Sequence, residues 1–575
     1  MAIGPDIDTG LYYDFDFGDF ALLESHLKEI EKKMKNIIKQ NQKFVSAPKS
    51  VAEARVYLQS VGESYKLEML EDLAARGEME IGFYENYAQN GTLAFVDMCA
   101  GPHVEKTLDI DENSFKVDKL AGAYWRGDSS KKMLTRVYVL AFDTREELDM
   151  HCKMLEEAKK RDHRTLGASM ELFTVVNEVG AGLPLYLPRG AKLRQILERY
   201  MLTEAEKAGY QYVYTPHIGK SDLFKKSGHL DHYADGMFAP INMVNLKGEG
   251  AEDGKVEQFY LKPMNCPMHH QIYLHKPRSY RDLPYRLMEY GTVYRYEESG
   301  ALTGLIRVRG FTQNDAHVYC MRSQLFEVIS EALARFLRAY GVLGIKDYKI
   351  RFSLPDFENN SEKYGEETQE WKDAIGAMRS VLDELGVEYY EAINEAAFYG
   401  PKIDIQVRNV NGKEDSLSTI QVDYSIAPKF GITYVGPNGQ EETPAIIHMA
   451  LMGSIDRFMA FMIEMNAGRF PFWVAPEQVR ILTVTESVAP FVAEIEAILK
   501  EEYLMVPLRF NEIRYTTDDR GESLAKKVRG AENDKVPVCL IIGEKDMTDR
   551  TVSIRYRGEE TTIPLNELGL YLKTL

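Results

Sequence analysis

The stretch that decides the fold is residues 310–319, Gly310-Phe311-Thr312-Gln313-Asn314-Asp315-Ala316-His317-Val318-Tyr319. If it forms a strand, successive side chains point to opposite faces, so Gln313, Asp315 and His317 project together. An amide, a carboxylate and an imidazole on one half-buried surface are costly to bury without partners. The stretch therefore predicts either a functional face or the exposed polar face of an edge strand, and its residues alone do not decide between them.

A second predicted strand lies just upstream, at residues 290–297, Tyr290-Gly291-Thr292-Val293-Tyr294-Arg295-Tyr296-Glu297. The loop that follows would return the chain as a hairpin and bring Arg295 near Arg307. Two guanidinium groups on adjacent strands repel each other unless an anion lies between them, and a polyphosphate would serve. The alternative is a surface ion pair of Arg295 with Glu297 or Glu298.

A third stretch reads as a strand that enters an apolar helix: Ala445-Ile446-Ile447-His448-Met449-Ala450-Leu451-Met452-Gly453-Ser454-Ile455-Asp456-Arg457-Phe458. Gly453 lets another backbone or a ligand come close. Arg457 follows one helical turn later on the same face, where it would reach a phosphate group.

Length and composition bound the class of protein. The chain has 575 residues and is 45% apolar, which is too much for one core and indicates about three domains. No apolar run approaches the length of a membrane span, and the first residues lack a secretory signal. The five cysteines are few and scattered, which argues against a disulfide framework and favours a reducing cytoplasm.

The formal net charge of −18, taken alone, argues against binding to nucleic acid. Local basic patches decide such contacts, however, whereas net charge governs solubility. Four short patches are candidates: Lys131-Lys132, Lys159-Lys160-Arg161, Arg307-Val308-Arg309 and Lys526-Lys527-Val528-Arg529. The alternative for each patch is a solvated surface that does not contact nucleic acid.

The pattern along the chain predicts its domains. Residues 22–41 have helical spacing of apolar positions, and residues 144–164 begin with a capping box and predict a charged connecting helix. We expect domain boundaries that divide the chain into residues 1–143, the linker helix 144–164, and residues 165–475 and 476–575. The last of these alternates strands and helices as a small α/β domain does.

Three stretches together resemble the three signatures of class II aminoacyl-tRNA synthetases. Tyr294-Arg295-Tyr296-Glu297 resembles the second signature and Gly453-Ser454-Ile455-Asp456-Arg457-Phe458 the third. The predicted helix 190–209 with the strand 212–216 resembles the first, which builds the family's dimer interface. Within the class, residues 261–267 and 310–317 resemble the threonyl-tRNA synthetase family, and the resemblance covers nearly the whole chain.

The resemblance implies a multidomain α/β fold. Residues 165–475 would form the class II antiparallel β-sheet core flanked by helices. Residues 1–143 would form a truncated α+β editing-like domain, and residues 476–575 an α/β anticodon-binding domain. The implied activity is the ATP-dependent ligation of L-threonine to tRNA(Thr) through a threonyl-adenylate, by a cytoplasmic homodimer without membrane contact.

By the same resemblance, a catalytic Zn²⁺ is held by Cys266, His317 and His448, which lie too far apart in sequence for their spacing to reveal a site. Threonine would complete the metal coordination with its amino and hydroxyl groups, with Asp315 accepting the hydroxyl proton. The other residues implied for the threonine pocket are Gln313, Tyr399, Met264 and Gln421. A pocket that binds the hydroxyl rejects valine by factors of about 10⁴ or more, whereas serine lacks only a methyl group.

The resemblance also implies the residues that act on ATP and tRNA. ATP with Mg²⁺ would be bound by Arg295, Glu297, Arg307, Arg457 and Ser454. Arg295 and Arg457 would also be catalytic, and His229 would assist deprotonation of the tRNA ribose hydroxyl. The alternative for His229 is a histidine placed at a helix end for structural reasons.

Two further sets follow from the outer domains. Asp546 and Arg555 correspond to anticodon-reading residues, although Asp546 stands where the family has Glu. Lys66, Asp97, Cys99 and His103 correspond to part of the family's editing site. The family's upstream pair of histidines is missing, together with its ubiquitin-like first domain. We therefore do not expect hydrolysis of seryl-tRNA, unless the chain is a fragment or another protein supplies it. Cys99 and His103 lack the two further ligands of a second zinc site.

Two rival readings remain from the sequence. One is a class II synthetase for serine or proline, which Cys266, His317, Asp315 and the N-terminal region argue against. The other is a non-catalytic paralogue that binds structured RNA. Such proteins usually lose an active-site residue, whereas Arg295 and Arg457 are present here.

Overall fold

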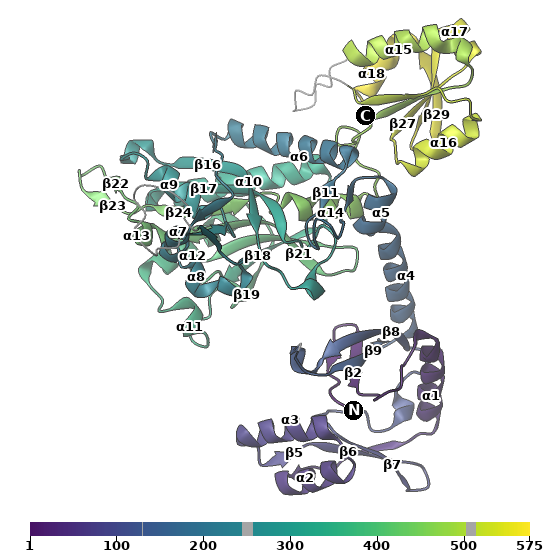
Figure 1. Cartoon of the computed structure of the whole chain (residues 1–575), viewed down its shortest axis with the longest axis vertical. Coiled ribbons are helices and arrows are strands. Elements are labelled where there is room, and N and C mark those ends of the chain that lie inside the picture. The colour runs from purple at the N-terminus through teal and green to yellow at the C-terminus, as the bar shows by residue number, and fades with distance from the viewer. Residues whose placement is uncertain (129, 244–256, 502–512) are drawn as a thin grey trace. The chain divides into compact units, whose positions relative to one another are not determined.

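The computed structural model describes residues 1–128, 130–243, 257–501 and 513–575, and the chain divides into two compact units, Met1–Glu156 and Glu157–Leu575 (Figure 1). The boundary lies within α4 (Arg145–Arg161), the predicted connecting helix. Its capping box is formed, because Thr144 Oγ1 accepts from Glu147 N at 3.3 Å and Glu147 Oε2 accepts from Thr144 N at 3.2 Å. In the described part of the chain, no helix is both long and apolar enough to cross a bilayer.

The first unit contains an antiparallel sheet against a helix. Its strand order is β1 (Asp6–Ile7), β2 (Gly10–Phe15), β9 (Met133–Ala141) and β8 (Phe115–Tyr124). Helix α1 (Leu27–Lys39) packs Leu27 against Val117 and Val139 of this sheet. The helix predicted over residues 22–41 is thus shorter than expected, because a 3-10 turn over Glu24–His26 precedes it.

The second layer of this unit is also mixed α+β, as predicted. Strands β3 (Lys43–Ser46), β6 (Phe83–Tyr87) and β7 (Leu93–Met98) form a sheet, and β4 (Lys49–Ser50) pairs with β5 (Glu80–Ile81). Helices α2 (Val51–Ser60) and α3 (Ser64–Ala75) pack Leu58 and Leu70 against Phe83.

The second unit is built on an eight-stranded sheet. Its order is β12 (Gln211–Tyr212), β16 (Tyr285–Tyr294), β17 (Gly310–Cys320), β24 (Ala445–Ala450), β21 (Glu414–Asp423), β20 (Lys402–Arg408), β18 (Tyr348–Leu354) and β19 (Tyr389–Ile393). All neighbours run antiparallel except at the two edges, where β12 is parallel to β16 and β19 to β18. The predicted antiparallel core is confirmed.

Four helices share one hydrophobic core with this sheet: α6 (Pro188–Lys207), α10 (Leu325–Leu343), α12 (Gln369–Glu384) and α14 (Ile455–Met465). Because side chains alternate along a strand, β17 sends Val318 and Cys320 into that core and turns His317 and Tyr319 to the other face. The sheet's second face therefore carries the polar residues singled out in the sequence.

Two predicted strands end earlier than expected, for reasons that lie in their hydrogen bonds. β16 stops at Tyr294 because Tyr296 N donates to Gly236 O at 2.9 Å and so leaves the ladder. β12 covers only Gln211–Tyr212, because Thr215 N donates to a side chain, Glu289 Oε2, at 3.2 Å.

The C-terminal region forms the predicted small α/β fold. Its five-stranded sheet has the order β26 (Tyr515–Asp518), β25 (Val479–Thr483), β27 (Val538–Ile542), β28 (Thr551–Tyr556) and β29 (Glu559–Pro564). The helices of this region are α15 (Ala489–Glu501), α16 (Leu524–Asn533), α17 (Glu544–Asp549) and α18 (Leu568–Leu572). The expected boundaries at residues 143, 164 and 475 stay predictions.

Candidate active site

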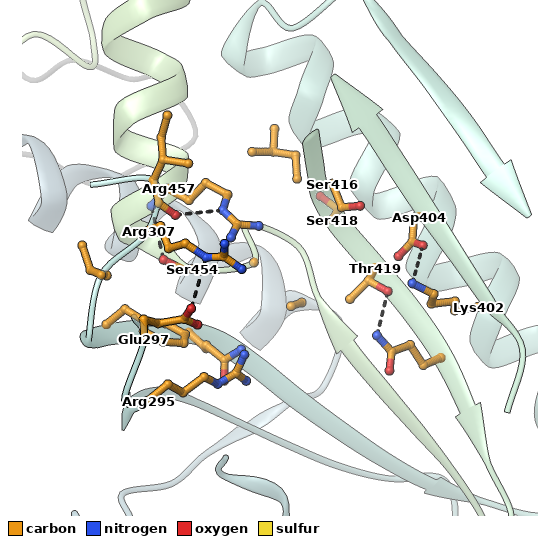
Figure 2. Close-up of a pocket in the computed structure, with 18 residues that line it drawn as sticks. Arg295, Glu297, Arg307, Lys402, Asp404, Ser416, Ser418, Thr419, Ser454 and Arg457 are labelled. Atoms are coloured by element: carbon orange, nitrogen blue, oxygen red, sulfur yellow. Dashed lines mark hydrogen bonds and ion pairs between the residues drawn. The ribbon is translucent and has the colours of Figure 1, made fainter. Parts of the chain in front are cut away.

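A cavity of about 460 Å³ lies over strands β17, β20 and β21 and reaches the start of α14 (Figure 2). Figure 2 shows the arginines gathered on one side of it and the side chains of β20 and β21 on the other. The residues labelled there are Arg295, Glu297, Arg307, Lys402, Asp404, Ser416, Ser418, Thr419, Ser454 and Arg457. The mixture of cations and small polar groups suits a ligand that is anionic at one end.

The cationic side of the cavity is held in place by α14 and by the loop before β17. Ser454 is the N-cap of α14 and its Oγ accepts from Arg457 N at 3.2 Å, while Arg457 Nε donates to Ile306 O at 3.3 Å. Burial lowers the pKa of Arg457, and repulsion from Arg295 and Arg307 adds to the lowering. Three guanidinium groups held this close favour a multiply charged anion between them.

The hairpin predicted from the sequence does bring Arg295 and Arg307 to one cavity. Arg295 N donates to Arg309 O at 2.9 Å, just beyond the end of the β16–β17 ladder. The carboxylate that pairs in this region is Glu297, whose Oε2 lies 3.2 Å from Arg307 Nε. Glu297 therefore pairs with Arg307, and among the described residues no ion pair joins Arg295 to Glu297 or Glu298, which was the alternative for it.

A second cluster lies on the same face of the sheet. Cys266, His317 and His448 each offer one metal-ligating atom, and these atoms lie within 4.8 Å of one another. His317 and His448 are directly opposite each other on β17 and β24, with ring centroids 4.7 Å apart. Cys266 is the first residue of α9 (Cys266–Tyr273), where the helix dipole favours a thiolate.

The three residues fit a metal ion by their donor atoms and by an unused nitrogen. His317 Nε2 is buried and has no hydrogen-bond partner among the described residues, a state that costs about 1–3 kcal/mol unless a ligand relieves it. His448 Nε2 bonds Asp423 Oδ2 at 3.1 Å, which leaves Nδ1 for the cluster. One sulfur and two imidazole nitrogens suit Zn²⁺, and three protein ligands leave a position open, as in catalytic sites.

Protons compete with a metal for this cluster. Burial by itself lowers the pKa of His448, but its contacts with Asp423 and Cys266 raise it to about 10. Burial raises the pKa of Cys266, and burial lowers that of His317. Ligands must be deprotonated to bind a metal ion, so binding here would release protons.

A carboxylate lies beside the cluster, as predicted for Asp315. Its side chain is buried, Asn265 Nδ2 donates to its Oδ2 at 2.9 Å, and its Oδ1 lies 3.8 Å from His317 Nδ1. Burial raises the pKa of Asp315. The carboxylate is thus held by Asn265 on one oxygen, and its other oxygen lies nearer His317 of the cluster.

Two glutamines link the cluster to the arginine cavity. Gln421 lies opposite His448 on β21, accepts from the Tyr399 hydroxyl, and lines the cavity together with Gln313. The Tyr399 ring lies 5.5 Å from that of His448. Met264 is half-buried in the turn before α9. Gln421 therefore borders both the cluster and the arginine cavity.

His229 begins α8 (His229–His232), and Ser227 sets its orientation. The Ser227 hydroxyl donates to Phe224 O at 3.2 Å and lies 2.7 Å from His229 Nδ1. Its oxygen can therefore accept a hydrogen bond from Nδ1–H. Burial lowers the pKa of His229 to about 4, and the positive charge of Arg295 contributes. His229 is therefore neutral at neutral pH, a form that can accept a proton.

Asp162, His163 and Glu464 form the other group of potential metal ligands in the described residues. Here both ring nitrogens are already used, because His163 Nε2 accepts from Leu305 N at 3.1 Å and Nδ1 lies 2.7 Å from Glu464 Oε1. Such a histidine holds the loop before Arg307 to α14 and has no nitrogen left for a metal ion.

The two candidate anticodon residues are engaged in contacts within the C-terminal region. Asp546 accepts from Gly543 N at 3.0 Å and from the Ser553 hydroxyl at 2.8 Å, so its short side chain caps α17. Arg555 on β28 donates to Glu532 at 2.6 Å. Arg555 Nη1 also lies 3.4 Å from Glu560 Oε1, so both candidate residues have partners within this region.

The residues predicted for a partial editing site lie in the first unit. Lys66 is fully buried and forms an ion pair with Asp97, which also accepts from the Tyr13 hydroxyl at 3.0 Å. The His103 ring packs on that of Tyr84 at 4.3 Å. In the described part of the chain, neither Cys99 nor His103 belongs to a group of three potential metal ligands.

Sequence reasoning missed the residues that support the cluster from behind. Asp423 bonds His448, Asn265 bonds Asp315, and His269 lies 2.8 Å from His317 between their Nδ1 atoms. One signal was available, since His269 follows Cys266 by three residues and so shares a helix face with it.

Three family models match the chain. Residues 250–466 match the tRNA synthetase class II core domain (G, H, P, S and T), and residues 478–575 match an anticodon binding domain. Residues 84–138 match the threonyl and alanyl tRNA synthetase second additional domain. The antiparallel sheet, its arginine-lined cavity and these matches define a class II aminoacyl-tRNA synthetase.

Similar proteins narrow this class. The threonine–tRNA ligase of Geobacillus kaustophilus is 42% identical over 97% of the chain and 81% of its own length, and that of Geobacillus sp. (strain WCH70) is 42% identical over 100% and 84%. A crystal structure titled as the RNA binding domain of threonyl-tRNA synthetase from Cryptosporidium parvum is similar with a TM-score of 0.63 and 32% identity, covering 72% of this chain and 98% of that one. The chain belongs to the threonine–tRNA ligase family.

Proposed function

We propose that this chain ligates L-threonine to the 3′ end of tRNA(Thr) with ATP, through a threonyl-adenylate. The observation that carries the proposal is the meeting of Cys266, His317 and His448 beside Asp315, with Gln421 bordering both this cluster and the arginine cavity. Family membership supports the reaction, and this geometry supports the choice of amino acid.

The amino acid is selected by its alcohol. A Zn²⁺ ion bound by Cys266, His317 and His448 would supply a Lewis-acidic position for the amino and hydroxyl groups of threonine. Asp315 accepts the hydroxyl proton, and its own orientation is fixed by Asn265. Valine leaves the other carboxylate oxygen, Asp315 Oδ1, without a donor, which is costly in a buried site and gives rejection by about 10⁴-fold or more.

Serine has the alcohol and lacks only a methyl group, a difference worth about 1–3 kcal/mol. Some seryl-tRNA would therefore form. Lys66 forms an ion pair with Asp97, and editing of seryl-tRNA is not part of the function proposed for this chain.

Activation joins the threonine carboxylate to the nucleotide. A carboxylate oxygen attacks the α-phosphorus of Mg²⁺-bound ATP, the new P–O bond forms, and pyrophosphate leaves. Arg295 contacts the carboxylate and the α-phosphate, whereas Arg307 and Arg457 bind the outer phosphates. The two arginines repel each other, so an anion bound between them is favoured. On binding, Arg307 exchanges Glu297 for phosphate, which frees Glu297 to accept from the adenine amino group.

Transfer then moves the threonyl group to the ribose. The tRNA hydroxyl attacks the carbonyl carbon, its proton goes to His229 Nε2, and AMP leaves. Ser227 holds Nδ1–H, so the nitrogen that accepts the proton is the bare one. Arg555 is the residue we assign to anticodon contact, with Asp546 limited by its capping role.

A homodimer and a cytoplasmic location belong to the same proposal. Tyr214 is 87% exposed next to β12, in the segment that resembles the family's dimer interface, and a second copy would cover it. All five cysteines are free, which suits a reducing compartment.

The proposal is tested by ATP–pyrophosphate exchange with threonine, serine, valine and proline, followed by charging of tRNA. We expect strong exchange with threonine, weaker exchange with serine and little with valine or proline, and loss of all exchange after metal removal. Exchange led by serine or proline would favour another class II enzyme. The absence of exchange with any amino acid, together with tight tRNA binding, would favour a non-catalytic RNA-binding paralogue.

A further inference from the structure

A second histidine lies behind His317, on the side away from the open position. His269 is fully buried on α9, its Nδ1 lies 2.8 Å from His317 Nδ1, and its Nε2 lies 3.1 Å from Glu289 Oε1. Both ring nitrogens of His269 therefore have a partner, and His317, His269 and Glu289 form a row of buried groups in contact.

The positions of the hydrogens in this row follow from Glu289. Glu289 is a carboxylate that accepts from Thr215 N at 3.2 Å and Thr215 Oγ1 at 2.7 Å, and Lys262 Nζ lies 3.6 Å away. Two hydrogen-bond donors and a nearby ammonium group hold this carboxyl group ionised, and an ionised carboxylate can only accept. His269 Nε2 must then carry a hydrogen, which it donates to Glu289.

Metal binding through His317 Nε2 requires the neutral form of His269, in which a hydrogen on Nε2 leaves Nδ1 bare. His269 Nδ1 is therefore the acceptor in its contact with His317, and His317 Nδ1 is the donor. The competing acceptor for that hydrogen is Asp315 Oδ1, but at 3.8 Å it lies outside hydrogen-bond distance. The consequence is that His317 Nε2, which is buried and has no hydrogen-bond partner among the described residues, is the bare nitrogen of this ring.

We propose that His269 and Glu289 form a positioning relay that fixes the tautomer and ring orientation of His317, so that its Nε2 stays available to the metal ion. This inference rests on the proposed zinc site and deepens it. His448 is oriented by a carboxylate without an intervening histidine, since its Nε2 bonds Asp423 directly at 3.1 Å. Carboxylates that orient metal-ligating histidines in this way raise metal affinity by about 10–100-fold.

The relay also extends the site to another part of the second unit. Thr215 belongs to the segment after β12, and Glu289 to β16, so the relay connects both of these to a ligand on β17. His270, the next residue on α9, is an internal contrast. It is equally buried, but its Nδ1 bonds the Tyr319 hydroxyl at 2.9 Å and it takes no part in the relay.

The relay is tested by Zn²⁺ affinity of the full chain, measured by competition with a chromophoric chelator. His269→Leu and His269→Asn have side chains of the same shape, and only Asn places an acceptor where Nδ1 was. We expect His269→Leu to weaken Zn²⁺ binding about 10–100-fold, His269→Asn to recover most of the loss, and the control His270→Leu to bind as the unaltered chain does. The Co²⁺ absorption spectrum should change in the same order.

Unaltered affinity in His269→Leu would overturn the relay, and so would equal losses in the Leu and Asn variants, because packing alone would then explain them. Should His269→Leu fail to fold, nitrogen NMR of the unaltered Zn²⁺-loaded chain with ¹⁵N-histidine decides. The relay requires hydrogen on Nδ1 of His317 and on Nε2 of His269, and hydrogen on Nδ1 of His269 would overturn it. An unaltered chain that binds no Zn²⁺ would overturn the zinc site and the relay together, whereas every other negative result leaves the zinc site standing.

Discussion

His317 and His448 face each other across neighbouring strands, as direct partners in the register of β17 and β24, with ring centroids 4.7 Å apart. Both strands are interior strands of the eight-stranded sheet, so hydrogen bonds on either side fix their backbones. Two of the three proposed metal ligands are therefore preorganised by the sheet, and the third, Cys266, comes from a separate element. That arrangement leads to the first prediction.

Cys266→Ser removes the one thiolate and should abolish tight Zn²⁺ binding while the sheet stays folded. Threonine-dependent ATP–pyrophosphate exchange should fall at least ~100-fold, because a Lewis-acidic metal contributes several kcal/mol. Cys152→Ser is the matched control, since Cys152 is also a free, half-buried cysteine but lies on α4. Equal activity of the two variants would contradict the assigned role of Cys266.

Asp315→Asn should narrow the preference for threonine over valine. The variant loses an ionised acceptor for the hydroxyl, worth about 1.5–3 kcal/mol, so kcat/KM for threonine activation should fall about 10–100-fold. Valine has no hydroxyl, and its kcat/KM should stay nearly constant. Parallel losses for both amino acids would mean that Asp315 supports the site's structure and does not read the alcohol.

Arg457→Gln should impair activation through ATP and spare tRNA binding. Removing one preorganised cation from the cavity should lower the rate of pyrophosphate exchange about 10²–10³-fold. The control is Arg550→Gln, an exposed arginine paired with Glu494 at 2.8 Å in the C-terminal region. A small effect of Arg457→Gln, comparable with that of the control, would remove Arg457 from the phosphate site.

The pH dependence of transfer should reveal His229. Its pKa in the folded chain is lowered from 6.5 to about 4, so the imidazole stays neutral well below its ordinary range. Single-turnover transfer of threonine to tRNA should hence be nearly flat between about pH 5 and 7, and His229→Ala should lower it at every pH. A decline centred on the ordinary value would show that His229 is solvated and charged.

The same shift has a consequence for stability with a definite sign. The unfolded chain binds a proton at His229 below pH 6.5, whereas the folded chain does so only near 4. The contribution of His229 to the free energy of unfolding is thus present above pH 6.5 and is lost as the pH falls toward 4. Acid unfolding of His229→Gln, compared with the unaltered chain, should show a smaller loss over that range.

Local patterns in the sequence predicted the elements that depend on local forces. The capping box at Thr144, the strand and helix on either side of Gly453, and the shared face of Asp315 and His317 all follow from neighbouring residues. Gly453 has φ +53°, and a Cβ there would lie 2.9 Å from Leu417 O, which is the close backbone approach expected of it.

Long-range pairing is what the sequence could not supply. Nothing in the spacing of Cys266, His317 and His448 shows that β17 and β24 are neighbours. The prediction that these residues form one site therefore depended on the family resemblance. The ends of β12 and β16 were misjudged for a related reason. Backbone groups there bond Glu289 and Gly236, partners that lie far away in the chain.

X-ray absorption at the zinc edge of the purified, metal-loaded chain tests the central claim most directly. The account predicts one Zn²⁺ per chain with a single sulfur neighbour at about 2.3 Å and nitrogen or oxygen neighbours at about 2.0–2.1 Å, two of them imidazoles. Added threonine, but not valine, should change the nitrogen and oxygen shell. A spectrum without sulfur, or one that valine changes as threonine does, would contradict a metal ion that selects threonine by its alcohol.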